Sequence, residues 1–240
     1  MPAGARVTQR TLPAPRSTLI PREREQQEIV RRLVDDQVRL LNLVGPPGAG
    51  KTRLAIMAAT ELAAKFTDGV ILVDLSPLRE ATLVPSSIGA ALGMREGTER
   101  VVERLKTVLS QRHVLLLLDN FEHLLSAAPL VGDLVAACPR VKVLVTSREA
   151  LHLASEHRFS VRPLAVPSES DEGNLSLLER VPSVALFCLR VRSIRSDWVL
   201  DQNNASAVAE LCRRLDGLPL GIELAAAWAG LLSPRGLMPA

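Results

Sequence analysis

Apolar residues along the chain follow two alternating patterns, short continuous runs and segments with helical spacing. The short runs predict strands at residues 39–44, 70–74, 114–119, 141–146 and 158–161. Helical spacing occupies the segments between them, at 52–65, 86–92, 98–110 and 130–137. This alternation is typical of βαβ units, and it predicts an α/β fold built on a mostly parallel sheet.

The two ends of the chain differ from this pattern. Residues 1–16 are rich in Pro, Arg, Ala and Thr without an apolar period, which predicts a disordered arm. An amphipathic helix is expected at 21–36, and a polar stretch after Pro167 leads into helical segments at 183–195, 203–215 and 220–231. We therefore expect an α/β domain at 17–166 and a small helical subdomain, or lid, at 167–240.

Composition narrows the class of protein. The 240 residues include no Tyr, four Phe and two Trp, so the core must consist of aliphatic side chains, as in a parallel sheet flanked by helices. The net charge of +3 is spread along the chain and does not indicate nucleic-acid binding. Three distant cysteines in apolar segments predict buried thiols, and neither a signal peptide nor a membrane span is visible. These features predict a soluble cytoplasmic protein.

The strongest chemical signal lies between the first predicted strand and the following helix. This segment fits G-x-x-x-x-G-K-[ST] without a gap and consists of Gly45, Pro46, Pro47, Gly48, Ala49, Gly50, Lys51 and Thr52. In such a loop backbone N–H groups surround phosphates, the lysine reaches the β- and γ-phosphates, and the hydroxyl binds Mg²⁺. The sequence therefore predicts ATP or ADP with Mg²⁺ as the ligand, and the adjacent Arg53 is a further candidate contact.

A second motif ends the apolar run at 114–119 with a carboxylate, Asp119. Paired with the phosphate loop, Asp119 is expected to hold Mg²⁺ through its water shell. The next residue is Asn120, where fast P-loop ATPases often carry a Glu that activates water. An amide cannot accept a proton at neutral pH, so Asn120 cannot be a general base. Glu122 is the alternative base, unless it is only a carboxylate favoured by the dipole of a helix start.

Four ordered motifs make the chain resemble the STAND class of signalling ATPases, and more narrowly the NB-ARC-type domains of bacterial transcriptional regulators. The motifs are Leu12-Pro13-Ala14-Pro15 with Arg22-Glu23 and the phosphate loop, Leu118-Asp119-Asn120-Phe121-Glu122-His123-Leu124, Val145-Thr146-Ser147-Arg148-Glu149-Ala150-Leu151, and Cys212-Arg213-Arg214-Leu215-Asp216-Gly217-Leu218-Pro219-Leu220. The resemblance covers about residues 12 to 234. It implies a P-loop NTPase sheet with strand order 5-1-4-3-2 and a nucleotide-binding lid.

The resemblance also implies roles for individual residues. Arg148 is similar to a sensor arginine that contacts the γ-phosphate of ATP; alternatively it pairs with a surface carboxylate such as Glu149. Pro219 is similar to the lid proline that packs on the adenine or sugar; alternatively it only starts a helix. Arg22 is a candidate nucleotide contact, although Pro21 replaces the family's glycine and removes a backbone donor.

Three functions remain open at this point. The first is an ADP/ATP switch with slow Mg²⁺-dependent hydrolysis, the second a fast AAA+-like ATPase, and the third a non-hydrolysing interaction module. Similar proteins continue into winged-helix and repeat domains, so we expect protein partners to supply sensing and output, with ATP-dependent self-association as an option. The segment at 220–232 has no Arg, Lys, Asn or Gln to read bases, so no direct nucleic-acid contact is expected.

Overall fold

The computed structural model describes residues 22–95, 100–171 and 173–229, which form two compact units. One unit contains residues 23–45 and 51–160, and the other contains residue 22, residues 46–50 and residues 161–229. The predicted arm at 1–16 lies outside the described residues. The domain boundary expected at 166 stays a prediction.

The first unit is built on a five-stranded sheet in which every pair of neighbours is parallel. Its strands are β1 (Leu40–Val44), β2 (Val70–Asp74), β3 (Leu115–Asp119), β4 (Lys142–Ser147) and β5 (Glu156–Ser160). Their order is β2-β3-β4-β1-β5, which confirms the predicted order read from the opposite edge. β5 begins earlier than expected because this edge strand is mostly polar, with Phe159 as its one apolar residue, and lacks the apolar run of the central strands.

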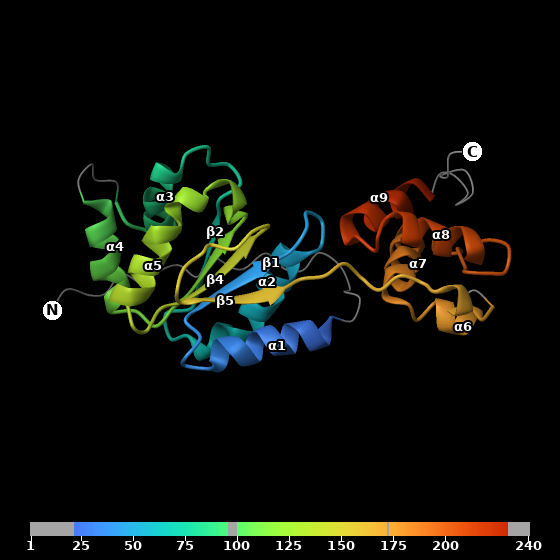
Figure 1. Cartoon of the computed structure of the whole chain (residues 1–240), viewed down its shortest axis with the longest axis horizontal. Coiled ribbons are helices and arrows are strands. Elements are labelled where there is room, and N and C mark those ends of the chain that lie inside the picture. Colours follow the sequence, from blue (N-terminus) through green and yellow to red (C-terminus); the bar gives the residue numbers. More distant parts are fainter. Residues whose placement is uncertain (1–21, 96–99, 172, 230–240) are drawn as a thin grey trace. The chain divides into compact units, whose positions relative to one another are not determined.

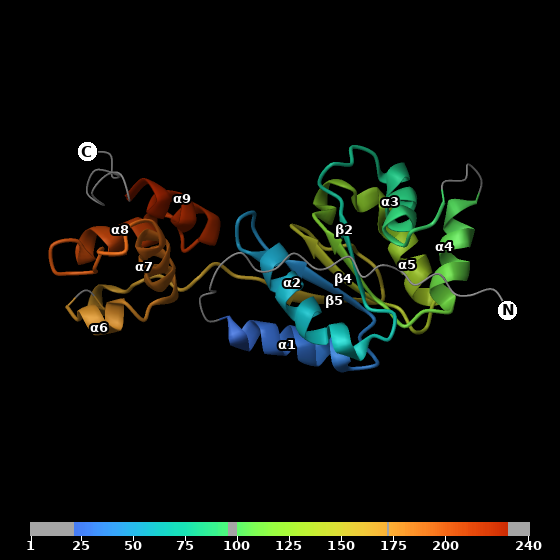
Figure 2. The same ribbon diagram turned by 180° about the vertical axis from the view of Figure 1, so that it is seen from behind.

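Helices cover both faces of this sheet (Figures 1 and 2). α2 (Lys51–Leu62) packs on β1, β3 and β4, and α1 (Glu23–Val34) packs on α2. On the other face α3 (Val84–Ala91) contacts β2, α5 (Ala128–Ala137) contacts β4, and α4 (Val101–Ser110) lies against both helices. Single 3₁₀ turns occupy Ala63–Lys65, Ala81–Leu83, Phe121–His123 and Leu125–Ala127.

The core of this unit follows the alternation of side chains along the strands. Leu40, Ile71, Leu116 and Val143 point to the face of α3, α4 and α5, where they join one buried apolar cluster. At the start of β4, Lys142 lies across the end of α1 and donates from Nζ to the carbonyl oxygens of Leu33 (2.8 Å) and Asp35 (2.7 Å). This contact satisfies carbonyl groups that a helix end leaves without partners.

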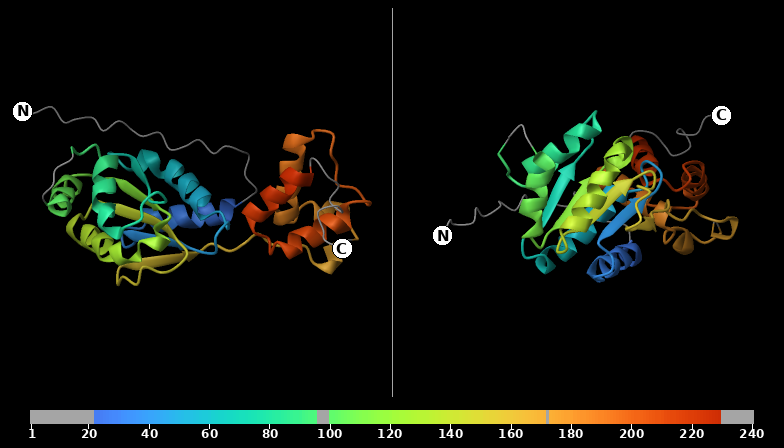
Figure 3. Two further views of the ribbon diagram at one scale, coloured as in Figure 1. Left: turned by 90° about the horizontal axis from the view of Figure 1, so that it is seen from above. Right: turned by 60° about the vertical axis from the view of Figure 1, so that its left-hand side comes forward.

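The second unit is helical (Figure 3). It has an apolar core of its own. Its helices are α6 (Leu175–Leu178), α7 (Pro182–Ile194), α8 (Ala205–Arg214) and α9 (Pro219–Ala229), with a 3₁₀ turn at Glu169–Asp171. α6 was not predicted because four residues are too few to show helical periodicity. The outer residues of two predicted helices, 98–99 and 230–231, lie outside the described residues.

Two further observations concern the whole described chain. Cys138, Cys188 and Cys212 are buried free thiols, as predicted, and burial raises the pKa of Cys188 to about 12. Across residues 22–95, 100–171 and 173–229, every helix is too short or too polar to cross a membrane.

Candidate functional site

The predicted phosphate loop connects the end of β1 to the start of α2. Gly48 and Gly50 have φ angles of +76° and +91°, a conformation that residues with a Cβ rarely adopt, so these two glycines permit the turn. The Gly45 N–H donates to the carbonyl oxygen of Ser147 at the end of β4 (3.4 Å), which ties the loop to a neighbouring strand. Because α2 begins at Lys51, its first N–H groups and its positive dipole end face this turn, an arrangement suited to an anion.

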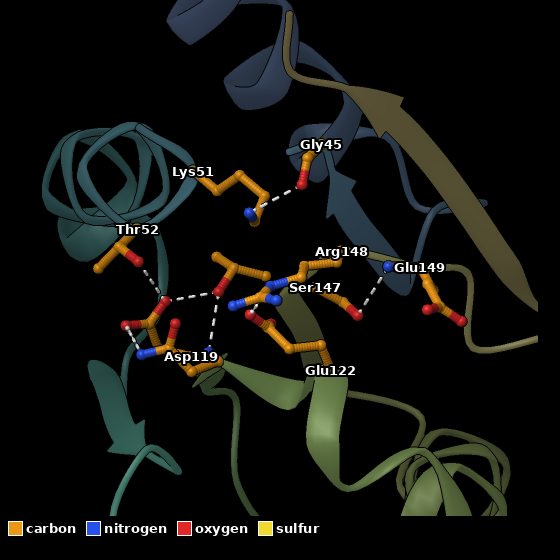
Figure 4. Close-up of polar contacts among 10 residues, drawn as sticks. Gly45, Lys51, Thr52, Asp119, Glu122, Ser147, Arg148 and Glu149 are labelled. Carbon is orange, nitrogen blue, oxygen red and sulfur yellow. Dashed lines mark hydrogen bonds and ion pairs between the residues drawn. The ribbon is translucent and has the colours of Figure 1, made fainter. Parts of the chain in front are cut away.

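Lys51 is buried at the beginning of α2. Its Nζ donates to the Gly45 carbonyl oxygen at 2.9 Å, so the side chain folds back over its own loop (Figure 4). Burial is the largest cause that lowers the pKa of Lys51 below its ordinary value. Of the nearby charges, the carboxylates of Glu122 and Asp119 raise this pKa, and Arg148 lowers it further. In these surroundings a bound anion would stabilise the charged form of the Lys51 side chain.

Asp119 ends β3 and faces the first turn of α2. Its Oδ1 accepts hydrogen bonds from the Thr52 hydroxyl at 2.7 Å and from the Thr146 hydroxyl at 2.5 Å (Figure 4). Burial raises the pKa of Asp119, whereas the two hydroxyl groups lower it and the charges of Asp74 and Glu122 raise it. The buried carboxylate and the Thr52 hydroxyl therefore form an oxygen-rich pair beside the loop, which is the donor type that Mg²⁺ prefers.

Asn120 adopts a left-handed conformation, with φ of +61°, directly after β3. Its N–H donates to the Thr146 hydroxyl at 3.0 Å, and its side-chain amide lies 3.4 Å from Asp119 Oδ2. Asn tolerates this backbone conformation better than most residues. The Asn120 amide thus supports Asp119. Thr146, which links Asn120 and Asp119, was missed in the sequence; its place in the motif before Arg148 was the available signal.

Arg148 and Glu122 form an ion pair at the ends of β4 and β3. Arg148 Nε donates to Glu122 Oε1 at 3.0 Å, and the exposed fractions of the two side chains are 56% and 17% (Figure 4). The carboxylate partner of Arg148 is therefore Glu122 and not the adjacent Glu149. Glu122 Oε2 is buried, and among the described residues no group donates to it.

Arg22 contacts the backbone of the phosphate loop. Its Nη1 donates to the carbonyl oxygen of Ala49 at 2.9 Å and its Nη2 donates to that of Arg162 at 2.8 Å. The buried guanidinium thereby supports the loop. Direct contact between Arg22 and a nucleotide stays a prediction.

The other predicted nucleotide contacts lie in the loop or at helix starts. Pro46 and Pro47 are exposed in the loop and Arg53 lies in the first turn of α2, while Pro219 is the first residue of α9. Their contact with a nucleotide also stays a prediction.

The residues present fit a Mg²⁺-nucleotide. Lys51 and the start of α2 supply positive charge for phosphates, and Thr52 with Asp119 supplies oxygen atoms for the metal. The buried Glu122 oxygen lacks a donor among the described residues, and a water molecule beside a phosphate would provide one. Bound Mg²⁺ would neutralise charge on the phosphates.

Comparison with solved structures shows the same fold. A Walker-type ATPase of Pyrococcus abyssi matches with a TM-score of 0.56 and 15% identity, over 91% of this chain and 69% of the other. A STAND protein with a tetratricopeptide repeat sensor from Pyrococcus horikoshii matches with a TM-score of 0.51 and 13% identity, over 85% of this chain and 29% of the other. These likenesses confirm a P-loop ATPase fold.

Relatives by sequence are longer than this chain. An uncharacterized protein of Mycobacterium tuberculosis is 40% identical over 208 residues, which are 85% of this chain and 49% of the relative. A candidate HTH-type transcriptional regulator of the same organism is 38% identical over 200 residues, which are 82% of this chain and 21% of the regulator. The chain thus spans about half, or less, of the length of these relatives. The family profile described as AAA domain matches residues 34–153, half of the chain, and the chain therefore belongs to this family of P-loop ATPase domains.

Proposed function

We propose that this chain is the nucleotide-binding core of an NB-ARC-like switch of the STAND class. It alternates between ADP and ATP, hydrolyses ATP slowly with Mg²⁺, and acts in transcription control. The single observation that carries this proposal is the ion pair between Arg148 and Glu122, because a γ-phosphate that binds Arg148 would break this pair.

The pair supplies a difference between the two nucleotides. Arg148 is half exposed at the carboxyl end of β4, the same edge of the sheet from which the phosphate loop leaves β1. A γ-phosphate carries more charge than a carboxylate and can accept two hydrogen bonds from a guanidinium, whereas Glu122 accepts one from Arg148 Nε. ATP therefore competes with Glu122 for Arg148, whereas ADP leaves the ion pair in place. A differential contact of this kind is what allows a ligand to shift a conformational equilibrium.

The same arrangement favours slow hydrolysis. Asn120 directs its amide towards Asp119 and cannot accept a proton. Glu122 remains the candidate base, and its charge is held by Arg148 until the arginine moves. The orphaned Glu122 oxygen is the one observation that favours the alternative of a fast ATPase, because it can accept a hydrogen bond from water.

The regulatory setting is inferred from the relatives. One relative is named as a candidate HTH-type transcriptional regulator, and one protein of the same fold is a STAND protein with a repeat sensor. Since this chain covers only part of each, sensing and output are assigned to other domains or to protein partners, and self-association with ATP is one form of output. No direct nucleic-acid contact is proposed for the described residues.

Arg148→Ala tests the sensor role. We expect the affinity for ATP to fall about tenfold or more, because a charged hydrogen-bonded contact to the γ-phosphate is lost, and the affinity for ADP to stay unchanged. Isothermal titration with each Mg²⁺-nucleotide measures both. Arg140→Ala is the matched control, since exposed Arg140 precedes β4 at its other end. Equal losses for ATP and ADP would show that Arg148 does not sense the γ-phosphate.

Nucleotide retention and turnover test the switch itself. We expect ADP to remain bound through purification and steady-state hydrolysis by the isolated chain to stay below about 1 s⁻¹, the lower end of typical enzyme rates. Chromatography of the nucleotide released by acid and a phosphate-release assay measure these quantities. Faster turnover favours the ATPase alternative, whereas a nucleotide-free protein with millimolar ADP affinity contradicts the switch. Unchanged thermal stability with Mg²⁺-ADP would support a non-hydrolysing interaction module.

A further inference from the structure

A buried polar side chain interrupts the apolar core strand β1. Asn42 is fully buried, between Leu41 and Leu43, and its Nδ2 donates to the carbonyl oxygen of Glu149 at 3.1 Å and to Glu156 Oε1 at 2.8 Å. Burying an amide is costly unless it forms hydrogen bonds. The two bonds of Asn42 lead to the loop that follows Arg148.

The acidic partner of Asn42 also has a buried side chain. The side chain of Glu156, at the start of the edge strand β5, is 0% exposed. Its Oε1 also accepts from the Leu151 N–H and its Oε2 from the His152 N–H, both at 3.0 Å, while Arg158 Nε lies 3.5 Å away. A buried carboxylate held by two backbone N–H groups and an amide fixes the backbone that carries those donors.

The backbone at this point needs such support. His152 has φ of +57°, in the left-handed region that is unfavourable for a residue with a Cβ. Such a conformation persists where surrounding bonds determine it. The hydrogen bond from the His152 N–H to Glu156 holds His152 in this conformation.

We propose that Asn42 and Glu156 are positioning residues for Arg148, a role that rests on the sensor function proposed above. The two side chains hold the carbonyl group of Glu149 and the N–H groups of Leu151 and His152, and we call these five residues the sensor-loop anchor. Because the anchored carbonyl belongs to the residue next to Arg148, the anchor fixes the origin of the arginine side chain. The Arg148 side chain can then move between Glu122 and a γ-phosphate while its backbone stays in place.

The anchor could instead serve stability alone, and the two roles differ in their effect on nucleotides. A general loss of stability weakens ATP and ADP binding together or leaves both unchanged. Loss of a positioning contact weakens the ligand that uses Arg148, which is ATP. Small displacements of a positioned charged group are costly because they lengthen its hydrogen bonds.

Glu156→Gln is the principal test. Gln keeps the shape of the side chain but has only one oxygen atom. It therefore cannot accept both from Asn42 and Leu151, which donate to Oε1, and from His152, which donates to Oε2. We expect the dissociation constant for ATP to rise about threefold to tenfold and that for ADP to stay within about twofold. Lys142→Met is the stability control, because it removes two hydrogen bonds to the end of α1 and leaves the anchor intact. Equal changes for ATP and ADP in Glu156→Gln would overturn the positioning role.

A double-mutant cycle separates this inference from the proposed function. In the Arg148→Ala background, Glu156→Gln should cause little further loss of ATP affinity, since the residue being positioned is gone. Additive losses overturn the anchor. If Arg148→Ala alone shows an ATP-specific loss and Glu156→Gln does not, the sensor stands and the anchor is wrong; if Arg148→Ala shows none, the sensor function itself fails.

Hydrogen exchange gives a readout that does not depend on nucleotides. The amides of Leu151 and His152 should exchange faster in Glu156→Gln than in the wild type, and at the wild-type rate in Lys142→Met. Unchanged exchange overturns the anchor whatever the nucleotides do. Should Glu156→Gln fail to fold, Asn42→Leu replaces it, because Leu has the same branching and the same number of heavy atoms but forms no hydrogen bonds. It should give a smaller ATP-specific loss, and the absence of such a loss would contradict the proposal.

Discussion

Lys51→Ala is expected to abolish binding of ATP. The ammonium group is buried beside the phosphate loop, near the charges of Glu122 and Asp119. A lysine at this place forms charged hydrogen bonds to phosphate oxygens, so loss of the charge removes a central part of the affinity. In the wild type, nucleotide at 100 times its dissociation constant should stabilise the fold by about 2.7 kcal/mol. The mutant should lose this gain with Mg²⁺-ATP, as measured by thermal unfolding with and without nucleotide.

The matched control is Lys65→Ala. Lys65 is exposed in the 3₁₀ turn that follows α2, at the end of this helix away from the loop. The same change of side chain at this position should leave the stabilisation by nucleotide intact. A Lys51→Ala protein that is folded and still stabilised by Mg²⁺-ATP would show that the loop does not bind phosphates in the expected way.

Asp119→Asn should have opposite effects on stability and on binding. Because burial raises the pKa of Asp119, the native state holds more protons than the unfolded state between the ordinary pKa of 3.8 and the raised value. The free energy of unfolding therefore falls as pH rises through this window, and the ionised side chain costs stability at neutral pH without Mg²⁺. Asn is neutral and its Oδ1 can still accept from Thr52 and Thr146, so the nucleotide-free mutant should be at least as stable as the wild type at neutral pH.

Binding of Mg²⁺-nucleotide should weaken in the same mutant. The carboxylate that would hold the hydrated metal is lost, and removal of such an outer partner typically costs about ten- to a hundredfold in affinity. Urea unfolding at several pH values without nucleotide, together with titration of ATP with and without Mg²⁺, measures both effects. Asp74→Asn is the control for the Mg²⁺ titration alone, since Asp74 ends the neighbouring strand β2 in register with Asp119 and is exposed, whereas its charge raises the pKa of Asp119 and so affects the pH dependence. A Mg²⁺ dependence that survives in Asp119→Asn would contradict the metal role.

Several parts of the site could be predicted because they follow from local sequence. The phosphate loop has a continuous signature, Asp119 ends an apolar strand, and Arg148 follows shortly after another. In a parallel sheet such residues come to one edge, and the structure places Lys51, Asp119, Glu122 and Arg148 there together. What remained open was the partner of Arg148. Adjacent residues at the end of a strand direct their side chains apart, which disfavours Glu149, and the 3₁₀ turn after β3 brings Glu122 within reach.

The sequence by itself determined the class of fold and the position of the phosphate loop, because these depend on periodicity and on contiguous residues. The order of the strands was implied only by the resemblance to a known family, and the structure confirmed it. Only the tertiary structure decided the pairing of Glu122 with Arg148 and the link of Thr146 to Asp119. It alone also revealed that Asn42 and Glu156 meet beneath the loop after Arg148. These contacts join residues that are far apart in the sequence, and the side chains of Asn42, Thr146 and Asp119 are buried. Burial depends on how the sheet and its loops pack, which a single sequence does not display.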